Sequence, residues 1–237
     1  MKSAVVTGAS AGIGLAVVRT LCTDGYSVTM AARREARLDA AAAVLRGEGF
    51  DVRTVATDVS AEGAAEQLIA GHLDHFGALD VVAANAGRGT NGTVAEASAA
   101  DITKMLAVNV AGPFAMAKAA LPALRATAGW FVVTASMSGV WPTIGSAGYS
   151  ASKAAAVSLA RSIAAEEAAN GVRACAICPA FVDTDMTSWL EGSIATEAML
   201  DANDVAEAVR FLLRLSPSAS VTELVLRRVG ASDQHKP

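Results

Sequence analysis

The order of apolar and polar positions along the chain predicts short buried strands that alternate with longer helical segments. The first run, Ser3–Thr7, is apolar and short, as is typical of a strand inside a parallel sheet. Similar runs predict strands at 27–32, 51–56, 79–84, 130–135, 172–178 and 223–229. Helices are predicted at 15–23, 35–46 and 61–76, and from about residues 98, 149 and 202 onward. This alternation implies an α/β fold, with a parallel sheet covered by helices on both faces.

The pattern continues without a break, which predicts a single domain over residues 1–237. No internal repeat, low-complexity tract or linker interrupts it. Ser98 and Asp101 form a capping-box pattern at the start of a long helix. The last helix is expected to be capped by Asn203 or Asp204. Residues 185–200 are interpreted as a short mobile lid that carries Met186, Trp189, Leu190 and Met199.

Composition and charge narrow the class of protein. Hydrophobic residues make up 53% of the chain and charged residues 18%, which fits a compact α/β enzyme. The net charge of −4 gives no indication of a nucleic-acid partner. No apolar run approaches the roughly 18 residues of a membrane span, so no membrane partner is expected. The chain leads directly into a strand, which leaves no room for a signal peptide, so we expect a cytoplasmic protein.

Cys175 and Cys178 form a C-x-x-C pattern that could indicate a redox pair or half of a zinc site. Because they lie in a predicted strand, an offset of three sends their side chains to opposite faces. We therefore interpret them as buried, inert thiols and predict no metal site. His72 and His75 share a helical face among charged neighbours and are expected to be exposed.

A glycine-rich turn between the first strand and the first helix is the first candidate binding feature. Its residues are Gly8, Ala9, Ser10, Ala11, Gly12, Ile13 and Gly14. Such a turn brings backbone N–H groups close together, and the helix that follows favours negative charge at its N-terminus. Strand, turn and helix in this order favour a dinucleotide phosphate site over a plain turn.

The second strand ends at Arg33 and Arg34, where many dinucleotide sites carry an acid that binds the ribose 2′-hydroxyl. A guanidinium suits a 2′-phosphate instead, which favours NADP(H), with NAD(H) still possible. Alternatively, both arginines simply decorate the next helix N-terminus, an unfavourable place for positive charge.

Other strand ends carry small or polar residues that a ligand could approach. Asp58 and Val59 follow the third strand, and the acid stands where an adenine amino group could be met. The fourth strand ends in Asn85, Ala86 and Gly87. Ligands of doubly wound sheets bind at the carboxyl ends of the strands. These residues are therefore predicted to lie in one site.

Asn109 lies four residues before Pro113 inside a predicted helix. Proline has no N–H to bond the carbonyl four residues back, so the carbonyl of Asn109 is expected to be free and the helix to kink. A free carbonyl beside a cleft could hold a water. Alternatively, the kink serves helix packing alone.

Tyr149 and Lys153 are the candidate catalytic pair, with Ser136 upstream of them. A spacing of four puts phenol and ammonium on one helical face. The positive charge is expected to lower the pKa of the phenol toward the range that acid–base catalysis needs. Alternatively, both are surface residues of a solvated helix.

In order and spacing, these motifs resemble the short-chain dehydrogenase/reductase family over nearly the whole chain. The motifs are Thr7-Gly-x-x-x-Gly-Ile-Gly14, Asn85-Ala-Gly87, Asn109, Ser136, Tyr149-x-x-x-Lys153 and Pro179. The resemblance implies a single Rossmann-type, doubly wound parallel sheet of about seven strands that binds NAD or NADP. It also implies a homodimer or homotetramer built through the two long helices that hold Asn109 and Tyr149.

The family's roles are carried over residue by residue. Tyr149 would exchange a proton with the substrate oxygen, and Lys153 would lower its pKa and hold the nicotinamide ribose. Ser136 would form a hydrogen bond to the substrate oxygen, and Asn109 would hold a water molecule. Val182 and Thr184, after Pro179, would meet the nicotinamide carboxamide. The sequence departs from many NADP-preferring members at Ala11, which lacks a basic side chain, so the NADP prediction depends on Arg33 and Arg34.

The resulting hypothesis is an NADP(H)-dependent oxidoreductase that moves a hydride between nicotinamide and a small-molecule carbonyl or secondary alcohol. Loop residues near the expected pocket suggest a partly apolar substrate; they are Met137, Ser138, Trp141, Ile144, Met186 and Trp189. One competing hypothesis is an NAD-dependent alcohol dehydrogenase of the same fold. Another is a redox-sensing regulator that binds NADP without turnover, although such proteins usually lose the tyrosine or the lysine.

Overall fold

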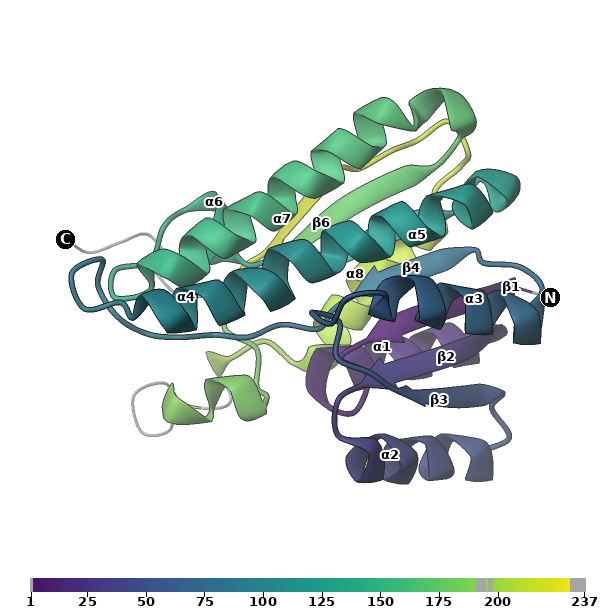
Figure 1. The fold of residues 1–237 in the computed structure, drawn as a ribbon, viewed down its shortest axis with the longest axis horizontal. Helices are drawn as coiled ribbons and strands as arrows, with labels where there is room; N and C mark the ends of the chain where they lie inside the picture. Colours follow the sequence, from purple (N-terminus) through teal and green to yellow (C-terminus); the bar gives the residue numbers. More distant parts are fainter. Residues whose placement is uncertain (1, 191–194, 196–197, 231–237) are drawn as a thin grey trace.

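The centre of the molecule is a seven-stranded, fully parallel sheet with the strand order β3-β2-β1-β4-β5-β6-β7 (Figure 1). It is seen in a computed structural model that describes residues 2–190, 195 and 198–230. The strands are β1 Lys2–Thr7, β2 Tyr26–Ala32, β3 Val52–Ala56, β4 Val81–Ala84, β5 Trp130–Thr134, β6 Arg173–Pro179 and β7 Glu223–Leu226. The predicted α/β class and the strand count are confirmed.

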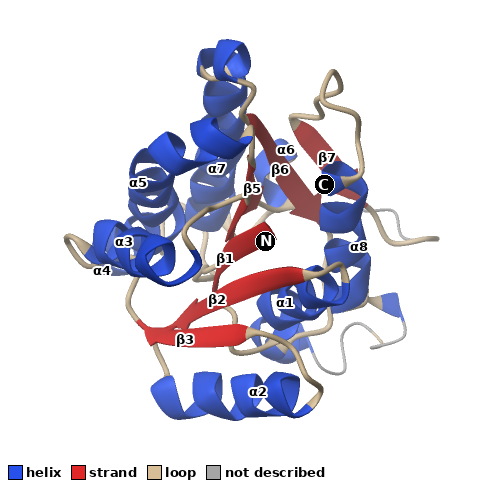
Figure 2. Ribbon diagram, turned by 90° about the vertical axis from the view of Figure 1, so that its right-hand side faces the viewer, coloured by secondary structure: helices blue, strands red, loops and turns tan. Residues whose placement is uncertain are grey.

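Helices cover both faces of the sheet, as the alternating pattern predicts (Figure 2). The helices on one face are α1 Gly12–Thr23, α2 Glu35–Gly47 and α8 Ala202–Leu213. Those on the other face are α3 Ala64–Phe76, α5 Gly112–Thr127 and α7 Ala147–Glu166. The shorter helical segments are α4 Ala99–Leu106, η1 Ala107–Ala111, α6 Met137–Val140, η2 Ala168–Asn170 and η3 Asp185–Leu190.

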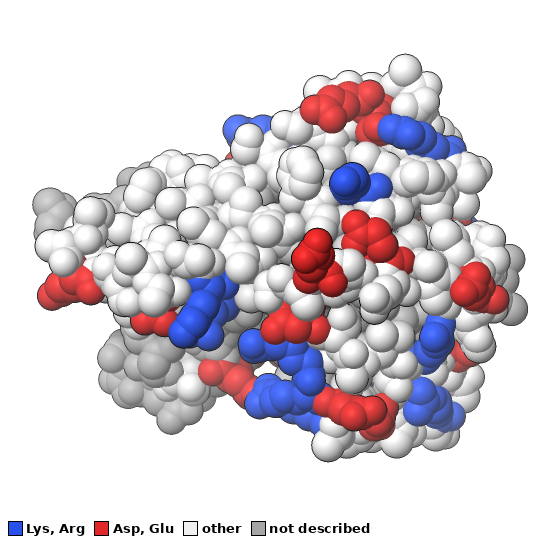
Figure 3. Space-filling model, viewed as in Figure 1, with Lys and Arg blue, Asp and Glu red and all other residues white. Residues whose placement is uncertain are grey.

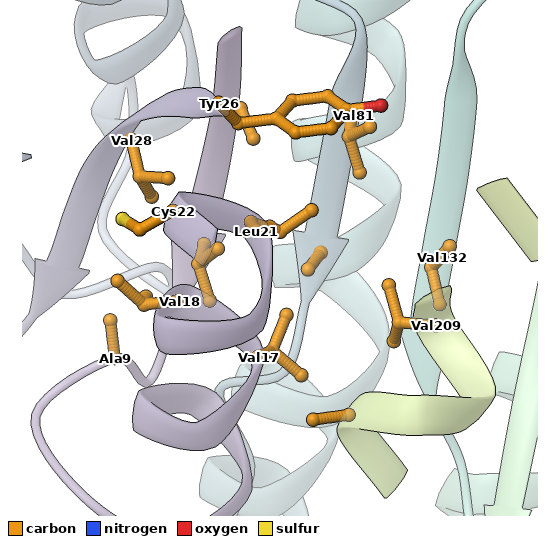
Figure 4. Close-up of a cluster of buried hydrophobic side chains, with 14 of the residues drawn as sticks. Ala9, Val17, Val18, Leu21, Cys22, Tyr26, Val28, Val81, Val132 and Val209 are labelled. Atoms are coloured by element: carbon orange, nitrogen blue, oxygen red, sulfur yellow. The ribbon is translucent and has the colours of Figure 1, made fainter. Parts of the chain in front are cut away.

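Two hydrophobic clusters, one on each face, explain why the strands read as unbroken apolar runs. In β1, Ala4 and Val6 belong to one cluster and Val5 to the other, because successive side chains point to opposite faces. Figure 4 shows Val17 and Leu21 of α1 packed in the first cluster. A sheet buried on both faces leaves its loops and strand ends as the place for a ligand site.

The strand order reverses at β1, since the chain proceeds outward through β2 to β3 and then returns to β4 on the other side. The loops after β1 and β4 therefore diverge, and a crevice opens between them at the carboxyl edge of the sheet. Ligands of open α/β sheets bind in this crevice.

The long helix predicted from residue 98 is present, and Ser98 accepts a hydrogen bond from the Asp101 N–H. The interruption predicted near Asn109 takes the form of a π turn, η1, which lies just before Pro113. The wider turn accommodates the proline, and turns of this kind are frequent at functional sites. By length and composition the continuous helix Ala99–Thr127 could cross a membrane, but nearly half of its most apolar window, 44%, is buried inside the protein.

Three details differ from the sequence predictions or refine them. His72 is wrong as an exposed residue: it is fully buried, because α3 turns it onto the sheet, whereas His75 is exposed. The cap of α8 is Asp201 rather than Asn203 or Asp204, and Asp204 completes a capping box from the third helical position. Of the predicted lid, residues 191–194, 196 and 197 and the side chains of Trp189 and Leu190 lie outside the described part of the chain.

The C-x-x-C pair behaves as predicted. Cys175 belongs to the first cluster and Cys178 to the second, so the two thiols lie on opposite faces of the sheet. Burial raises the pKa of each to about 12, and that of Cys22 to about 11. These thiols are inert, and Cys175 and Cys178 cannot share a metal ion.

Candidate active site

A cleft of about 1040 Å³ opens at the carboxyl edge of the sheet, where the crevice is expected. This is the upper end of the range for ligand pockets and leaves room for a dinucleotide and a small substrate. Of the site residues predicted from the sequence, all line the cleft except Gly14 and Asn109, which are buried beside it. Those lining it are Gly8, Ser10, Gly12, Ile13, Arg33, Arg34, Asp58, Val59, Asn85, Ala86, Gly87, Ser136, Tyr149, Lys153, Pro179, Val182 and Thr184.

The glycine turn forms a narrow backbone cradle at one end of the cleft. Gly8 has φ +66° and Gly12 φ +52°, a region that side chains disfavour. A Cβ at Gly14 would lie 2.2 Å from the Gly8 carbonyl oxygen, and one at Gly12 would lie 2.9 Å from the Thr184 side chain. The turn thus packs against its own strand and the β6 loop, and most of its residues up to the N-terminus of α1 at Gly12 line the cleft. This geometry fits a pyrophosphate.

Thr7 ties this turn to the neighbouring strand end, a role that the sequence reading missed. Its hydroxyl oxygen accepts hydrogen bonds from the N–H groups of Asn85 and Ala86, at 3.1 and 3.0 Å. The ends of β1 and β4 are held together by these two bonds. The sequence signal that could have indicated this role is a threonine at the end of an apolar strand. In the structure Thr7 is nearly fully buried.

Arg33 and Arg34 lie at the outer end of the same cleft, both exposed, as a 2′-phosphate contact requires. Asp58 faces them across this end, and its pKa is lowered by hydrogen bonds from the Ser60 hydroxyl and N–H, with a smaller contribution from Arg33. Asp58 therefore stays ionised at neutral pH, able to accept a hydrogen bond from an amino group.

Asn109 acts through its side chain, in a way that the proline argument did not anticipate. Its amide oxygen accepts from the Arg88 N–H and its amide nitrogen donates to the Arg88 carbonyl, both at 2.8 Å. The same nitrogen donates to the Ser152 hydroxyl at 3.0 Å, and Ser152 donates to the carbonyl of Tyr149 at 2.7 Å. Asn109 thus fixes the loop after β4 against the helix that carries the catalytic pair. Whether its own carbonyl holds a water stays a prediction.

Lys153 is 5% exposed, and its ammonium donates to the carbonyl oxygen of Thr134 at 2.7 Å. Burial lowers the pKa of Lys153 to about 8, so it is still mainly protonated at neutral pH. A Cβ at Gly87 would lie 3.6 Å from the ammonium nitrogen, so the loop after β4 closes directly over it.

Burial raises the pKa of Tyr149 above its ordinary value, and the neighbouring Ser136 side chain lowers it by a smaller amount. The expectation that Lys153 brings this pKa below its ordinary value is wrong for this arrangement. The ammonium is directed to Thr134 and lies 5.7 Å from the centroid of the tyrosine ring. The phenol of Tyr149 is therefore protonated at neutral pH and is poised to donate its proton.

The loop after β6 forms another wall of the cleft, beside the glycine turn. Thr187 ties it together by donating to the carbonyl of Val182 at 2.6 Å. Farther out, Asp185 of η3 forms an ion pair with Arg37 of α2, which lowers the pKa of Asp185. The pair joins the two sides of the cleft near Arg34, and the sequence reading missed it because its members are 148 residues apart.

Past Tyr149, the cleft is lined by apolar side chains, in agreement with the partly apolar substrate expected from the sequence. Met137, Ile144 and Met186 contribute, and Ile144 is 72% exposed. Trp141 is exposed but does not line the cleft, and the side chain of Trp189 lies outside the described residues.

Comparison with known proteins agrees with this geometry. The family model described as short chain dehydrogenase matches residues 2–193. The chain belongs to the short-chain dehydrogenase family. An uncharacterised oxidoreductase of Staphylococcus epidermidis is 33% identical over 96% of this chain and 97% of its own, and one of Staphylococcus aureus is 34% identical over the same shares.

Two solved structures have the same fold. An alcohol dehydrogenase of the archaeon Thermococcus sibiricus, complexed with 5-hydroxy-NADP, superimposes with a TM-score of 0.89 at 35% identity over 99% of this chain and 100% of its own. A second structure, gox2181, gives a TM-score of 0.86 at 28% identity over 94% of each chain. This chain is thus an oxidoreductase of the NAD(P)-dependent short-chain type, which acts on CH–OH or C=O groups.

Proposed function

We propose that this short-chain dehydrogenase uses NADP(H) and works chiefly as a reductase of small-molecule carbonyl compounds. The observation that carries the proposal is the placement of one protonated phenol, Tyr149, beside Ser136 and Lys153, in a cleft whose far end carries two exposed arginines. A protonated acid is the form that reduction of a carbonyl requires.

The residues present fit a nicotinamide dinucleotide, because the Gly8–Gly14 turn packs tightly against its own strand and its glycines Gly8 and Gly12 line the cleft without side chains. The nicotinamide supplies the hydride when it is bound. The cradle would hold the pyrophosphate, and Lys153 and Thr184 would contact the nicotinamide end.

The protein's own contribution is orientation and one proton. Ser136 and Tyr149 bind the carbonyl oxygen by hydrogen bonds and stabilise the negative charge that develops on it. Tyr149 then donates its proton to that oxygen. The buried positive charge of Lys153 stabilises the phenolate that remains, an effect strengthened by the low local dielectric. Asn109 fixes the position of the loop after β4 relative to helix α7.

The preference for NADP over NAD rests on Arg33 and Arg34. A guanidinium matches a phosphate with two parallel hydrogen bonds, and the ends of these side chains are exposed at the cleft. That the Thermococcus sibiricus enzyme is complexed with an NADP derivative also supports this preference.

A cytoplasmic homodimer or homotetramer is the proposed assembly. The long helices α5 and α7 lie side by side on one face of the sheet (Figure 1), and Phe114 on α5 is 60% exposed. Figure 3 shows a largely uncharged surface over the beginning of α7, while α4 beside it carries Asp101 and Lys104. Size-exclusion chromatography with light scattering measures the assembly directly.

The test of function is a panel of aldehydes and ketones, with the absorbance of NADPH and of NADH followed in parallel. We expect oxidation of NADPH with at least some carbonyls and a much weaker response with NADH. A clear preference for NADH would support an NAD-dependent alcohol dehydrogenase and contradict the arginine argument. NADPH binding without turnover of any carbonyl or alcohol would favour the regulator.

A further inference from the structure

Arg228 is a charged residue of the cleft that neither the catalytic group nor the predicted cofactor contacts use. It follows the end of β7 by two residues and lines the cleft. Its guanidinium carbon lies 5.5 Å from the centroid of the Phe181 ring, a cation–π distance. The register pairs Leu226 with Pro179, so Arg228 stands level with Phe181 above the sheet.

The strand that precedes Arg228 is well separated in the sheet from the strands that carry the predicted phosphate contacts. Between β1, which carries the glycine turn, and β7 lie β4, β5 and β6, so four inter-strand spacings separate the two ends. At about 4.8 Å per spacing this is roughly 19 Å. Arg33 and Arg34 follow β2, one strand farther away still. Arg228 therefore approaches the cleft from the β7 edge of the sheet, on the other side of β1 from the strand that ends at Arg33 and Arg34.

Each of the other charged residues of the cleft contacts a protein group or lies at the cofactor end, and Arg228 too has protein contacts. Arg88 pairs with Asp101, Lys153 with the Thr134 carbonyl, and Asp185 with Arg37. Among the residues that the structure describes, the carboxylates that line the cleft are Asp58, near Arg33, and Asp185, which is paired with Arg37. Apolar Met137, Ile144 and Phe181 line the same end.

We propose that the substrate carries a carboxylate together with an apolar chain, so that the reaction interconverts an oxo acid and a hydroxy acid. This deepens the proposed function and rests on it. Ser136 and Tyr149 hold the reacting carbonyl, the apolar residues contact the chain, and the Arg228 guanidinium binds the carboxylate by two parallel hydrogen bonds. Arg228 need not be without other partners, because its five N–H donors can serve more than one acceptor.

The first test measures binding without turnover. The protein loaded with NADP⁺ cannot reduce a ketone, so affinities are measured by calorimetry. The probes are three oxo acids and their neutral amides: 4-oxopentanoate, 5-oxohexanoate and 6-oxoheptanoate, each against its amide. The length series finds the distance between carbonyl and carboxylate that the cleft accommodates. We expect at least one acid to bind tenfold or more tighter than its amide.

The variants assign this preference to Arg228. Arg228→Met should reduce the difference between acid and amide to less than about twofold, and Arg228→Lys should retain part of it, since it keeps the charge but not the paired geometry. Arg227→Met is the matched control: it removes a guanidinium from the adjacent, exposed position that does not line the cleft. Equal binding of acid and amide at every length, or a preference that survives in Arg228→Met, would overturn the proposal.

A second measurement separates this proposal from the proposed function. In steady-state reduction by NADPH, kcat/KM for the best acid should fall about 30-fold or more in Arg228→Met, while that for its amide stays within threefold. Loss of both to the same extent would refute a specific role in carboxylate recognition. Turnover of neutral ketones with no acid preference defeats this inference alone, whereas acid-selective binding without any turnover defeats the proposed function alone.

Discussion

Among the described residues, two buried polar clusters differ in their surroundings: one lies beside the cleft and the other does not. His72, fully buried between β1, β2 and α3, has both ring nitrogens within 3.1 Å of protein partners: Thr29 on one side, Ser3 and the Ala78 carbonyl on the other. Lys153 is nearly as buried, at 5% exposed, but Tyr149 beside it is only partly buried and lines the cleft.

The difference shows what burial does in each place. The His72 cluster is closed, and burial lowers the pKa of His72 to about 4, so the ring is neutral and holds two strands and a helix together. Around Lys153 the partners are fewer and the ammonium stays charged. A closed cluster stabilises the fold, whereas an open one keeps a hydrogen-bonding position for a substrate.

The largest effect is expected in the open cluster of Ser136, Tyr149 and Lys153. Tyr149→Phe removes one oxygen atom from this cluster. We expect turnover of any identified carbonyl to fall about 10³-fold or more, since general acid catalysis contributes about 10² to 10⁴ and the oxyanion also loses a donor. NADPH affinity, measured by fluorescence, should change less than threefold. Tyr26→Phe, at the chain's other tyrosine, is the control that should keep activity.

Lowering the pH should destabilise the folded protein through protonation of His72 in the closed cluster. Its pKa is about 4 in the folded protein and about 6.5 in the unfolded chain, so the unfolded state binds the proton first. Stability from this group is complete above pH 6.5 and is lost as the pH falls toward 4. The difference corresponds to about 3 kcal/mol.

Urea unfolding between pH 7 and pH 4.5 measures this loss. His72→Asn should lower stability at pH 7 but flatten its dependence on pH. His75→Asn changes the exposed histidine one helical turn away on α3. This variant should keep the wild-type dependence of stability on pH. A wild-type slope unchanged in His72→Asn would show that His72 is not the titrating group.

Asn109→Ala should reduce both stability and activity, because Asn109 is buried like His72 but also supports the active site. It leaves the N–H and carbonyl of Arg88 without their partner, so we expect about 2 kcal/mol of destabilisation together with a tenfold or larger loss of kcat. Exposed Asn203→Ala is the control. Loss of stability with unchanged kcat would show that Asn109, like His72, stabilises the fold without supporting catalysis.

The smallest expected effect is at the cofactor end. Arg33→Met should raise the KM for NADPH about tenfold and leave that for NADH within twofold, because only NADPH carries the 2′-phosphate. Arg46→Met, on α2 away from the cleft, should change neither. An equal change for both cofactors would contradict the assignment of Arg33.

The sequence predicts the strands and the site's main residues because each depends on a local pattern: apolar runs for strands, glycine for the turn, a spacing of four for the catalytic pair. It does not predict contacts between distant segments. His72 looks exposed among its sequence neighbours, yet its partners Ser3 and Thr29 lie 69 and 43 residues away. The pairing of Asn109 with Arg88 and of Arg37 with Asp185 is hidden for the same reason.

The direction of the pKa shift at Tyr149 could not be predicted either. Spacing brings Lys153 within reach, but the direction depends on where the ammonium points and on how deeply the phenol is buried. Both are properties of the packed loops rather than of the motif.

The three buried thiols have a practical consequence. Because Cys22, Cys175 and Cys178 are covered by the core and held as thiols, alkylating reagents and air should leave the folded enzyme untouched, and purification needs no reducing agent. A single cysteine introduced on the surface would then be the one site that a maleimide dye labels, which makes the native chain a ready background for fluorescence studies of its cleft.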